Sequence, residues 1–233
     1  MIKREIIAKS DFIISFGSML ADNKEDIRNS IIESIAKTNA KFTYMHPIDN
    51  IDLKLYYTQF IKYEVGSEEG ICALLMDTFI KECDEKTRKF INDLDLGYIS
   101  GESSAGEEEF EESYSNYLEA KNKLLIIGDD LIEHEKIENI IKLLALIKKY
   151  TNFELIVLNE DLGNKINLCT NFDLEEIEEL KSFNGTLVYK LIDEQQNDEL
   201  IASKTFANIA KVANGDEIYI NSKDEKIKRT LKV

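Results

Sequence analysis

The feature that most constrains the fold is a buried strand that stops at a glycine, and it occurs twice. In the first copy, the apolar run Phe12–Phe16 ends at Gly17 and Ser18, and a helical pattern follows. In the second copy, the run Leu124–Ile127 ends at Gly128, with a long helical pattern beyond it. Two strand-glycine-helix units in one chain predict a parallel sheet whose functional edge lies at the glycine turns.

Hydrophobic periodicity predicts the remaining elements of this sheet and its helices. Further strands are expected at Ala40–Met45, Gln59–Val65 and Phe153–Leu158, the second of them stopped by Gly66. Helices are expected at residues 23–38, 68–80, 87–94, 133–150 and 173–180, with the acidic run after Gly106 leading into another. The windows Gly97–Gly106 and Asn159–Asn171 are predicted to be loops, from their small and irregular residues.

The character of the chain changes after residue 184. A strand is predicted at Thr186–Ile192, a helix from about Ser203, and two alternating strands around a hairpin at the end of the chain. The sequence therefore predicts an α/β domain of Rossmann-like units at residues 1–183. A small β-rich piece is predicted to follow it at residues 184–233.

Charge sets the expectation for partners. The chain of 233 residues has 29 lysines and arginines against 45 aspartates and glutamates, a formal net charge of −16. Such a surface repels phosphate backbones and anionic lipid, so no nucleic-acid partner is expected and a basic protein partner is favoured. The acidic cluster at residues 107–112 is interpreted as a solvated helix face, and as the place where such a partner would dock.

No apolar run approaches the roughly 20 residues that span a bilayer, so no direct membrane insertion is expected. The apolar stretch near the N-terminus is broken by Lys9, Ser10 and Asp11, and it does not fit a signal peptide. These observations predict a cytoplasmic protein.

The cysteines and histidines are too dispersed to predict a metal site. Cys72, Cys83 and Cys169 lie far apart without a CxxC pair, which favours reduced thiols, and the first two are expected on one side of a helix. His46 and His134 have no partner at zinc-ligand spacing. Both histidines are predicted to be surface or loop residues, and no metal site is expected.

Five segments in a fixed order carry a resemblance to a known family. They are SDFIISFGSMLADN from Ser10, NAKFTYMHPID from Asn39, YEVGSEEGICALL from Tyr63, LLIIGDDLIEHEKIENIIKLL from Leu124 and ASKTFANIAKVANGDEIYINS from Ala202. In this order the segments resemble the molybdopterin oxidoreductase superfamily. Within it they resemble the C-terminal part of the large iron-sulfur (G) subunit of bacterial respiratory complex I, an NADH-quinone oxidoreductase.

The resemblance implies a fold like that of formate dehydrogenase and DMSO reductase, with residues 184–233 forming the start of a C-terminal β-barrel. The family's iron-sulfur clusters and molybdenum ligand would lie outside this chain, so no cofactor is expected within it. The family's dinucleotide would bind at Gly17, Ser18, Gly66 and Gly128, but the acids after Gly128 disfavour a pyrophosphate there. These four residues are therefore expected to form a vestigial site.

The function implied is a non-catalytic structural and docking domain of the complex I G subunit, without molybdopterin. Its partners would be other subunits of a membrane-associated respiratory complex, which would hold it in the cytoplasm beside the inner membrane. The alternative is a module that still binds a nucleotide or pterin dinucleotide. An independent hydrolase is disfavoured, because Ser18 lacks a GxSxG elbow and a serving histidine, so the segment is not expected to be catalytic alone.

Overall fold

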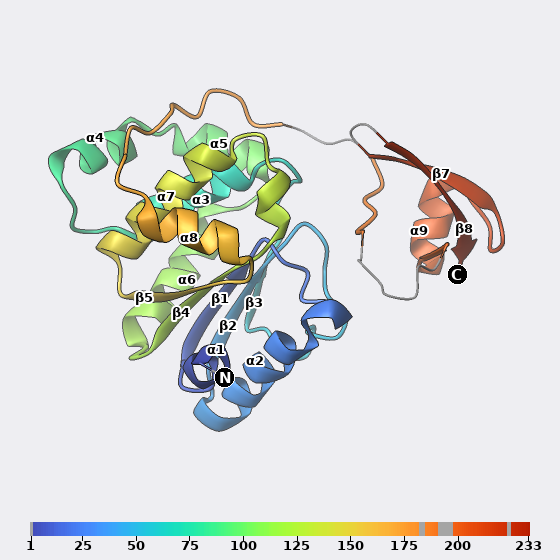
Figure 1. Cartoon of the computed structure of the whole chain (residues 1–233), viewed down its shortest axis with the longest axis horizontal. Coiled ribbons are helices and arrows are strands. Elements are labelled where there is room, and N and C mark those ends of the chain that lie inside the picture. The colour runs from blue at the N-terminus through green and yellow to red at the C-terminus, as the bar shows by residue number, and fades with distance from the viewer. Residues whose placement is uncertain (1, 182–184, 191–197, 223–224) are drawn as a thin grey trace. The chain divides into compact units, whose positions relative to one another are not determined.

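The computed structural model describes residues 2–181, 185–190, 198–222 and 225–233. The chain divides into two compact units, Met1–Phe183 and Asn184–Val233. The larger unit is an α/β fold around a five-stranded parallel sheet (Figure 1). The smaller unit holds a three-stranded sheet and one helix within the part that the structure describes.

The larger unit contains α1 (Ile2–Ile7), β1 (Phe12–Phe16), η1 (Asp22–Lys24), α2 (Glu25–Thr38), β2 (Lys41–Met45), β3 (Gln59–Ile61), α3 (Glu68–Phe79), α4 (Glu85–Asp93), α5 (Leu96–Ser103), α6 (Glu107–Glu119), β4 (Lys123–Ile127), η2 (Asp130–Glu133), α7 (Ile137–Tyr150), β5 (Phe153–Val157) and α8 (Glu160–Leu168). The smaller unit contains β6 (Glu199–Ile201), α9 (Lys204–Ala210), β7 (Glu217–Ser222) and β8 (Glu225–Lys232).

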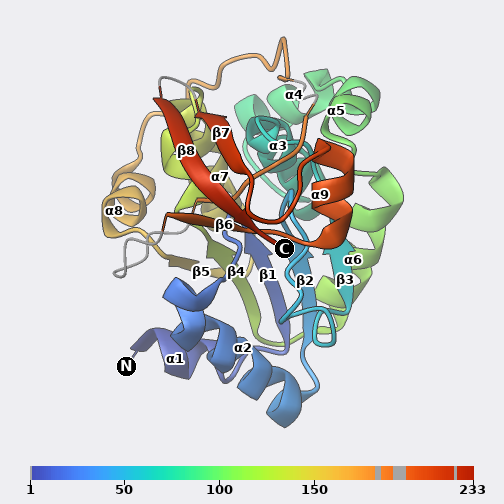
Figure 2. The same cartoon turned by 90° about the vertical axis from the view of Figure 1, so that its right-hand side faces the viewer.

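The sheet of the larger unit has the strand order β3-β2-β1-β4-β5, and every pair of neighbours is parallel (Figure 2). Strand β1 lies between β2 and β4, so the chain runs outward from it in both directions. Its end therefore lies at the topological switch point, where ligands of open α/β sheets bind at the carboxyl edge. Gly17 and Gly128, which follow β1 and β4, flank this point.

Helices cover both faces of this sheet, and this explains why its central strands β1 and β4 are mostly apolar. Alternate residues of β1 enter two separate cores: Phe12 and Phe16 pack toward α3, α6 and α7, whereas Ile13 packs with side chains of α1 and α2. Figure 1 shows α1 and α2 on one side of the sheet, with α3 and α7 on the other. The central strands β1 and β4 are buried on both faces, whereas β5 at the edge of the sheet is partly exposed.

Most predicted elements of the larger unit are confirmed, although the predicted strand at Gln59–Val65 is shorter. It leaves the sheet after Ile61, and the Glu64 N–H donates instead to the carbonyl oxygen of Ser103 (2.9 Å). This departure brings residues 62–67 to the carboxyl edge as a loop.

The predicted loop at Gly97–Gly106 is wrong, because residues 96–103 form helix α5. The Asp95 carboxylate caps this helix by accepting from the Tyr98 N–H (3.0 Å). Ile99 is buried and packs closely on Gly70 of α3. A cap and one buried side chain thus outweigh the low helix propensity of the glycines.

The chain after β5 also differs from the prediction. Residues 160–168, expected to be irregular, form α8, capped by Asn159 and buried through Leu162 and Ile166. The predicted helix at Asp173–Leu180 is wrong, because this segment is neither helix nor strand. Its backbone N–H groups find side-chain partners instead: the Glu175 N–H donates to Asn139 Oδ1 (2.9 Å).

Two smaller expectations also change. Cys72 lies within α3, but Cys83 lies beyond the end of that helix, so the two cysteines do not share a helical face. The strand predicted at Thr186–Ile192 does not form over residues 186–190, and its last two residues lie outside the described part of the chain.

The smaller unit confirms the predicted C-terminal strands, which pair antiparallel as β7 and β8. Strand β6 adds parallel to β8. Among its described residues, Ala207 and Leu231 are the buried apolar side chains, whereas Ile201, Ile209 and Tyr219 are largely exposed. This unit therefore has a thin core. In either unit, no described helix has both the length and the apolar character needed to cross a bilayer.

Candidate functional site

The glycine turns after β1 and β4 pack directly against each other at the switch point. The Gly128 N–H donates to the Phe16 carbonyl oxygen (2.8 Å), and the Asp130 N–H donates to the Gly17 carbonyl oxygen (3.1 Å). A Cβ added to Gly128 would lie 1.8 Å from the Gly17 carbonyl oxygen and 2.5 Å from the Ser18 nitrogen. The backbones thus approach so closely that only glycine fits at position 128.

The side chain of Leu131 covers the first turn. Gly17 has a left-handed backbone (φ 72°), and a Cβ at this position would lie 2.8 Å from Leu131 Cγ and Cδ2. Ser18 is buried, and its Oγ accepts from the Leu20 N–H (3.3 Å). The switch point is therefore filled by groups of the chain itself.

The loop after β3 joins this edge through His134. Gly66 is left-handed (φ 91°), and its carbonyl oxygen lies 3.2 Å from His134 Nε2. The Lys136 N–H donates to His134 Nδ1 (3.0 Å), so the neutral ring carries its proton on Nε2 and donates it to Gly66. The same Nε2 lies 3.4 Å from Glu68 Oε2 at the start of α3.

The second histidine lies on the same edge. His46 follows β2, its side chain is 4% exposed, and its Nε2 lies 3.2 Å from Asp130 Oδ2. The Ile48 N–H donates to Nδ1 (3.0 Å), and the Ile48 carbonyl oxygen also lies 2.9 Å from that nitrogen. The ring consequently has hydrogen-bond partners in its neutral form and in its protonated form.

Burial dominates the electrostatics of this edge. It raises the pKa of the Glu68 carboxyl, against the opposing effects of backbone N–H groups and of the charges of His134 and His46. It also raises the pKa of Tyr63, which is fully enclosed, and the charges of Glu68 and Asp130 add to that effect. Charges from both histidine-carboxylate pairs thus act on the same buried groups, and the two pairs form one electrostatic cluster.

We call His46, Glu68, Asp130 and His134 the histidine-carboxylate cluster. It places two imidazole rings, which can both donate and accept hydrogen bonds, beside two carboxylates. Its carboxylates, together with the Asp129 carboxylate paired to Lys24 (2.8 Å), oppose the approach of a phosphate group. Among the residues that the structure describes, no three His, Cys, Asp or Glu side chains gather to hold a metal ion.

The four residues predicted for a vestigial site gather at this edge: Gly17, Ser18 and Gly128 are in contact, and Gly66 joins them through His134. Both histidines lie in loops, as predicted, but neither is a surface residue: the His46 side chain is almost completely buried, the His134 side chain is largely buried, and each lies beside a carboxylate. His46 and Asp130 are 84 residues apart, and Glu68 and His134 are 66 residues apart. No short motif in the sequence could therefore indicate either pair.

The chain matches no protein-family model and no curated protein.

We expect the Glu68→Gln variant to flatten the dependence of stability on pH. Because the pKa of Glu68 in the folded state is raised above the ordinary value of 4.5, the folded state binds more protons just above that value. The free energy of unfolding of the unmodified protein should then fall as pH rises above 4.5, and this part of the fall should disappear in the variant.

Urea unfolding at about pH 5 and about pH 7.5 measures this effect. The exposed Glu82→Gln variant is the control, because it removes the same charge without removing a buried carboxyl. Equal pH slopes for Glu68→Gln and for the unmodified chain would contradict the prediction.

Proposed function

We propose that residues 1–183 form a non-catalytic docking domain of a respiratory NADH-quinone oxidoreductase, in the large iron-sulfur subunit. The proposal rests on the order of the five motifs that resemble this subunit, and on an α/β fold of the matching class. In this proposal the iron-sulfur clusters lie outside the chain, and the partners are neighbouring subunits at the inner membrane. The fold is of the formate dehydrogenase and DMSO reductase type, and residues 184–233 begin the C-terminal barrel.

The filled switch point is the observation that carries the docking role. A dinucleotide at this edge needs room for its pyrophosphate and free N–H donors at the glycine turn. Here Leu131 occupies the space over Gly17, and the N–H groups of Gly128 and Asp130 bind backbone oxygens. These contacts leave neither that space nor those donors for a pyrophosphate. They favour a domain that binds partner proteins through its outer surface and holds no ligand in the crevice.

The test is copurification. The full-length parent protein, tagged in its own cells and solubilised in mild detergent, should purify with the other subunits of a quinone reductase. Mass spectrometry identifies those subunits. Purification of the parent protein without them, or a parent reading frame without cluster-binding cysteines upstream of this segment, would contradict the proposal.

A second candidate function is dinucleotide binding, and the strand order favours it. The order β3-β2-β1-β4-β5 places Gly17 and Gly128 where α/β proteins bind such ligands. Calorimetric titration of the chain with guanine nucleotides and dinucleotides separates the two functions. The docking proposal expects no heat of binding at millimolar ligand, whereas saturable heat that is lost in a Gly17→Ala variant would favour the second function.

A further inference from the structure

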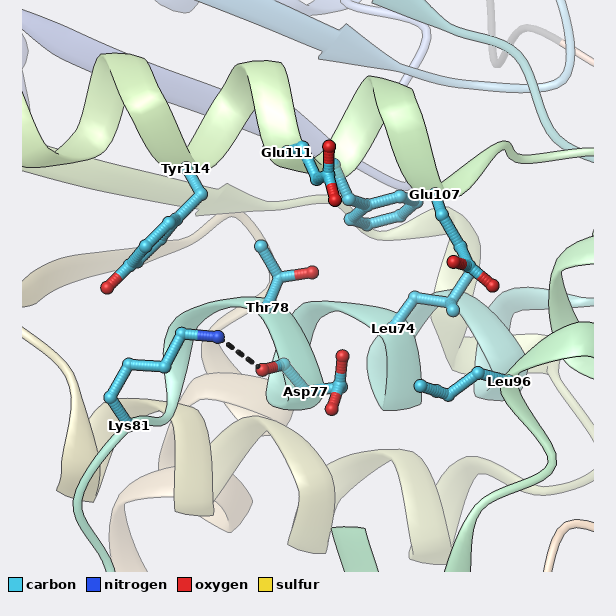
Figure 3. A pocket seen from close by; sticks show the side chains of 9 residues that line it. Leu74, Asp77, Thr78, Lys81, Leu96, Glu107, Glu111 and Tyr114 are labelled. Carbon is cyan, nitrogen blue, oxygen red and sulfur yellow. Dashed lines mark hydrogen bonds between the residues drawn. The ribbon is translucent and has the colours of Figure 1, made fainter. Parts of the chain in front are cut away.

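A groove lies between helices α3 and α6. It encloses about 170 Å³ and has an apolar floor of Leu74 from α3 with Phe110 and Tyr114 from α6. Leu74 and Phe110 are almost completely buried. Figure 3 shows Leu74 and Tyr114 among the side chains that line the groove. We call this feature the α3–α6 groove.

Three carboxylates line the same groove. Asp77 projects from α3, and Glu107 and Glu111 project from α6 (Figure 3). Among the described residues, no ion pair or side-chain hydrogen bond joins any of these carboxylates to another residue. The groove thus combines apolar surface with three carboxylates that form no ion pair within the described part of the chain.

The chain places one cation of its own at the end of this groove. The ammonium of Lys81 lies 4.8 Å from the centre of the Tyr114 ring and donates to the Asp77 carbonyl oxygen (3.0 Å). An ammonium over an aromatic face is a favourable cation–π contact. The groove residues therefore already hold one cation against an apolar surface.

The distribution of charge indicates the same class of ligand. Residues 184–233 contain eight basic and eight acidic residues, so the formal charge of −16 belongs entirely to residues 1–183. A field of this sign steers basic proteins toward the larger unit and repels acidic ones.

We propose that the α3–α6 groove receives an arginine or lysine side chain from a basic segment of a partner protein. The aliphatic part of that side chain packs on Leu74 and Phe110, and its charged head meets Asp77, Glu107 and Glu111. This inference rests on the docking role proposed above and names the partner chemistry for one surface of that domain.

A peptide of alternating arginine and leucine residues is the probe. It is titrated into the full chain labelled with ¹⁵N, and amide shifts are followed by NMR. We expect saturable shifts in Leu74–Lys81 and Glu107–Tyr114, weakened by added salt because the contacts are ionic. A peptide with citrulline in place of arginine keeps the shape without the charge and should not bind the groove.

Two matched variants show whether the groove or the general charge attracts the peptide. Glu107→Gln with Glu111→Gln removes two groove carboxylates, and should weaken binding about tenfold if each ion pair contributes a few tenths to one kcal/mol. Glu108→Gln with Glu119→Gln removes the same charge from exposed positions of the same helix, and should leave affinity within about twofold. Thermal unfolding of each variant checks that both remain folded.

Equal affinities for the two double variants, or saturable shifts that map outside the groove, would overturn the inference. A different result would contradict the proposed function. If the parent protein copurifies with quinone-reductase subunits but the peptide does not bind the groove, the groove inference alone is wrong. If the peptide binds the groove while the parent protein purifies without those subunits, the respiratory assignment is wrong and the groove inference stands.

Discussion

Replacing Gly128 with alanine is expected to destabilise the larger unit by about 4 kcal/mol or more, beyond the range of most single substitutions. The new Cβ would lie 1.8 Å from the Gly17 carbonyl oxygen and 2.1 Å from its carbonyl carbon. Both are backbone atoms of the turn after the central strand, so no side-chain rotation relieves the overlap. The two turns must separate, and this breaks the hydrogen bond from the Gly128 N–H to Phe16 (2.8 Å).

Urea unfolding followed by circular dichroism measures this loss. Gly101→Ala in α5 is the matched control, because a Cβ there meets nothing within 4 Å. An exposed glycine in a helix costs roughly 0.5–1 kcal/mol relative to alanine, so the control should gain stability. A Gly128→Ala protein as stable as the unmodified chain would show that the two turns do not touch in solution.

The Gly17→Ala variant is expected to lose about 2–4 kcal/mol, from two separable causes. The backbone of Gly17 is left-handed (φ 72°), which disfavours any side chain, and a Cβ would also overlap Leu131 at 2.8 Å. Gly66→Ala shares the first cause, with a milder steric contact. Gly66 is also left-handed (φ 91°), but the nearest atom to its added Cβ is Lys181 Cβ at 3.2 Å.

A double-mutant cycle isolates the second cause. Leu131→Ala alone should cost about 2–5 kcal/mol, as a buried leucine does. In the Gly17→Ala, Leu131→Ala double variant the overlap is gone, so the total loss should be about 1–2 kcal/mol smaller than the sum of the single losses. Strictly additive losses would mean that Leu131 does not cover the Gly17 turn.

The sheet could be predicted from the sequence because its central strands are buried on both faces. Phe12–Phe16 and Leu124–Ile127 are almost purely apolar, and each ends at a glycine that the backbone geometry requires. The all-parallel pairing followed from connections too long for hairpins. Local composition was enough for this part of the fold, since the constraint acts on every residue of the strand.

Predictions from local composition were wrong for two segments whose structure depends on contacts with residues far away in the sequence. The segment 173–180 has helical spacing, but its N–H groups are held by side chains from other elements, such as the Tyr98 hydroxyl, which accepts from the Leu180 N–H (3.1 Å). In α5 the reverse occurs, because burial of Ile99 stabilises a helix in a glycine-rich window. In both cases tertiary contacts outweigh weak intrinsic propensities.

The histidine-carboxylate cluster was outside the reach of sequence reasoning for a related cause. His46, Glu68 and Asp130 follow or begin three different elements, and only the parallel sheet brings those ends to one edge. The glycines marked the edge, because a glycine has a local backbone role. The histidines have no comparable local signal, because their carboxylate partners come from distant segments that only the sheet topology brings together.

The thin core of the smaller unit has a consequence for how the chain unfolds. Among the described residues of this unit only Ala207 and Leu231 are buried apolar side chains, so it has little apolar burial to oppose its conformational entropy. Its hydrogen bonds should open, and its amide protons exchange, well below the free energy that protects β1 and β4. Unfolding of the whole chain is then not two-state, and a single melting temperature would average two transitions. The chain has no tryptophan and ten tyrosines, so site-resolved amide exchange is the method that assigns a stability to each unit.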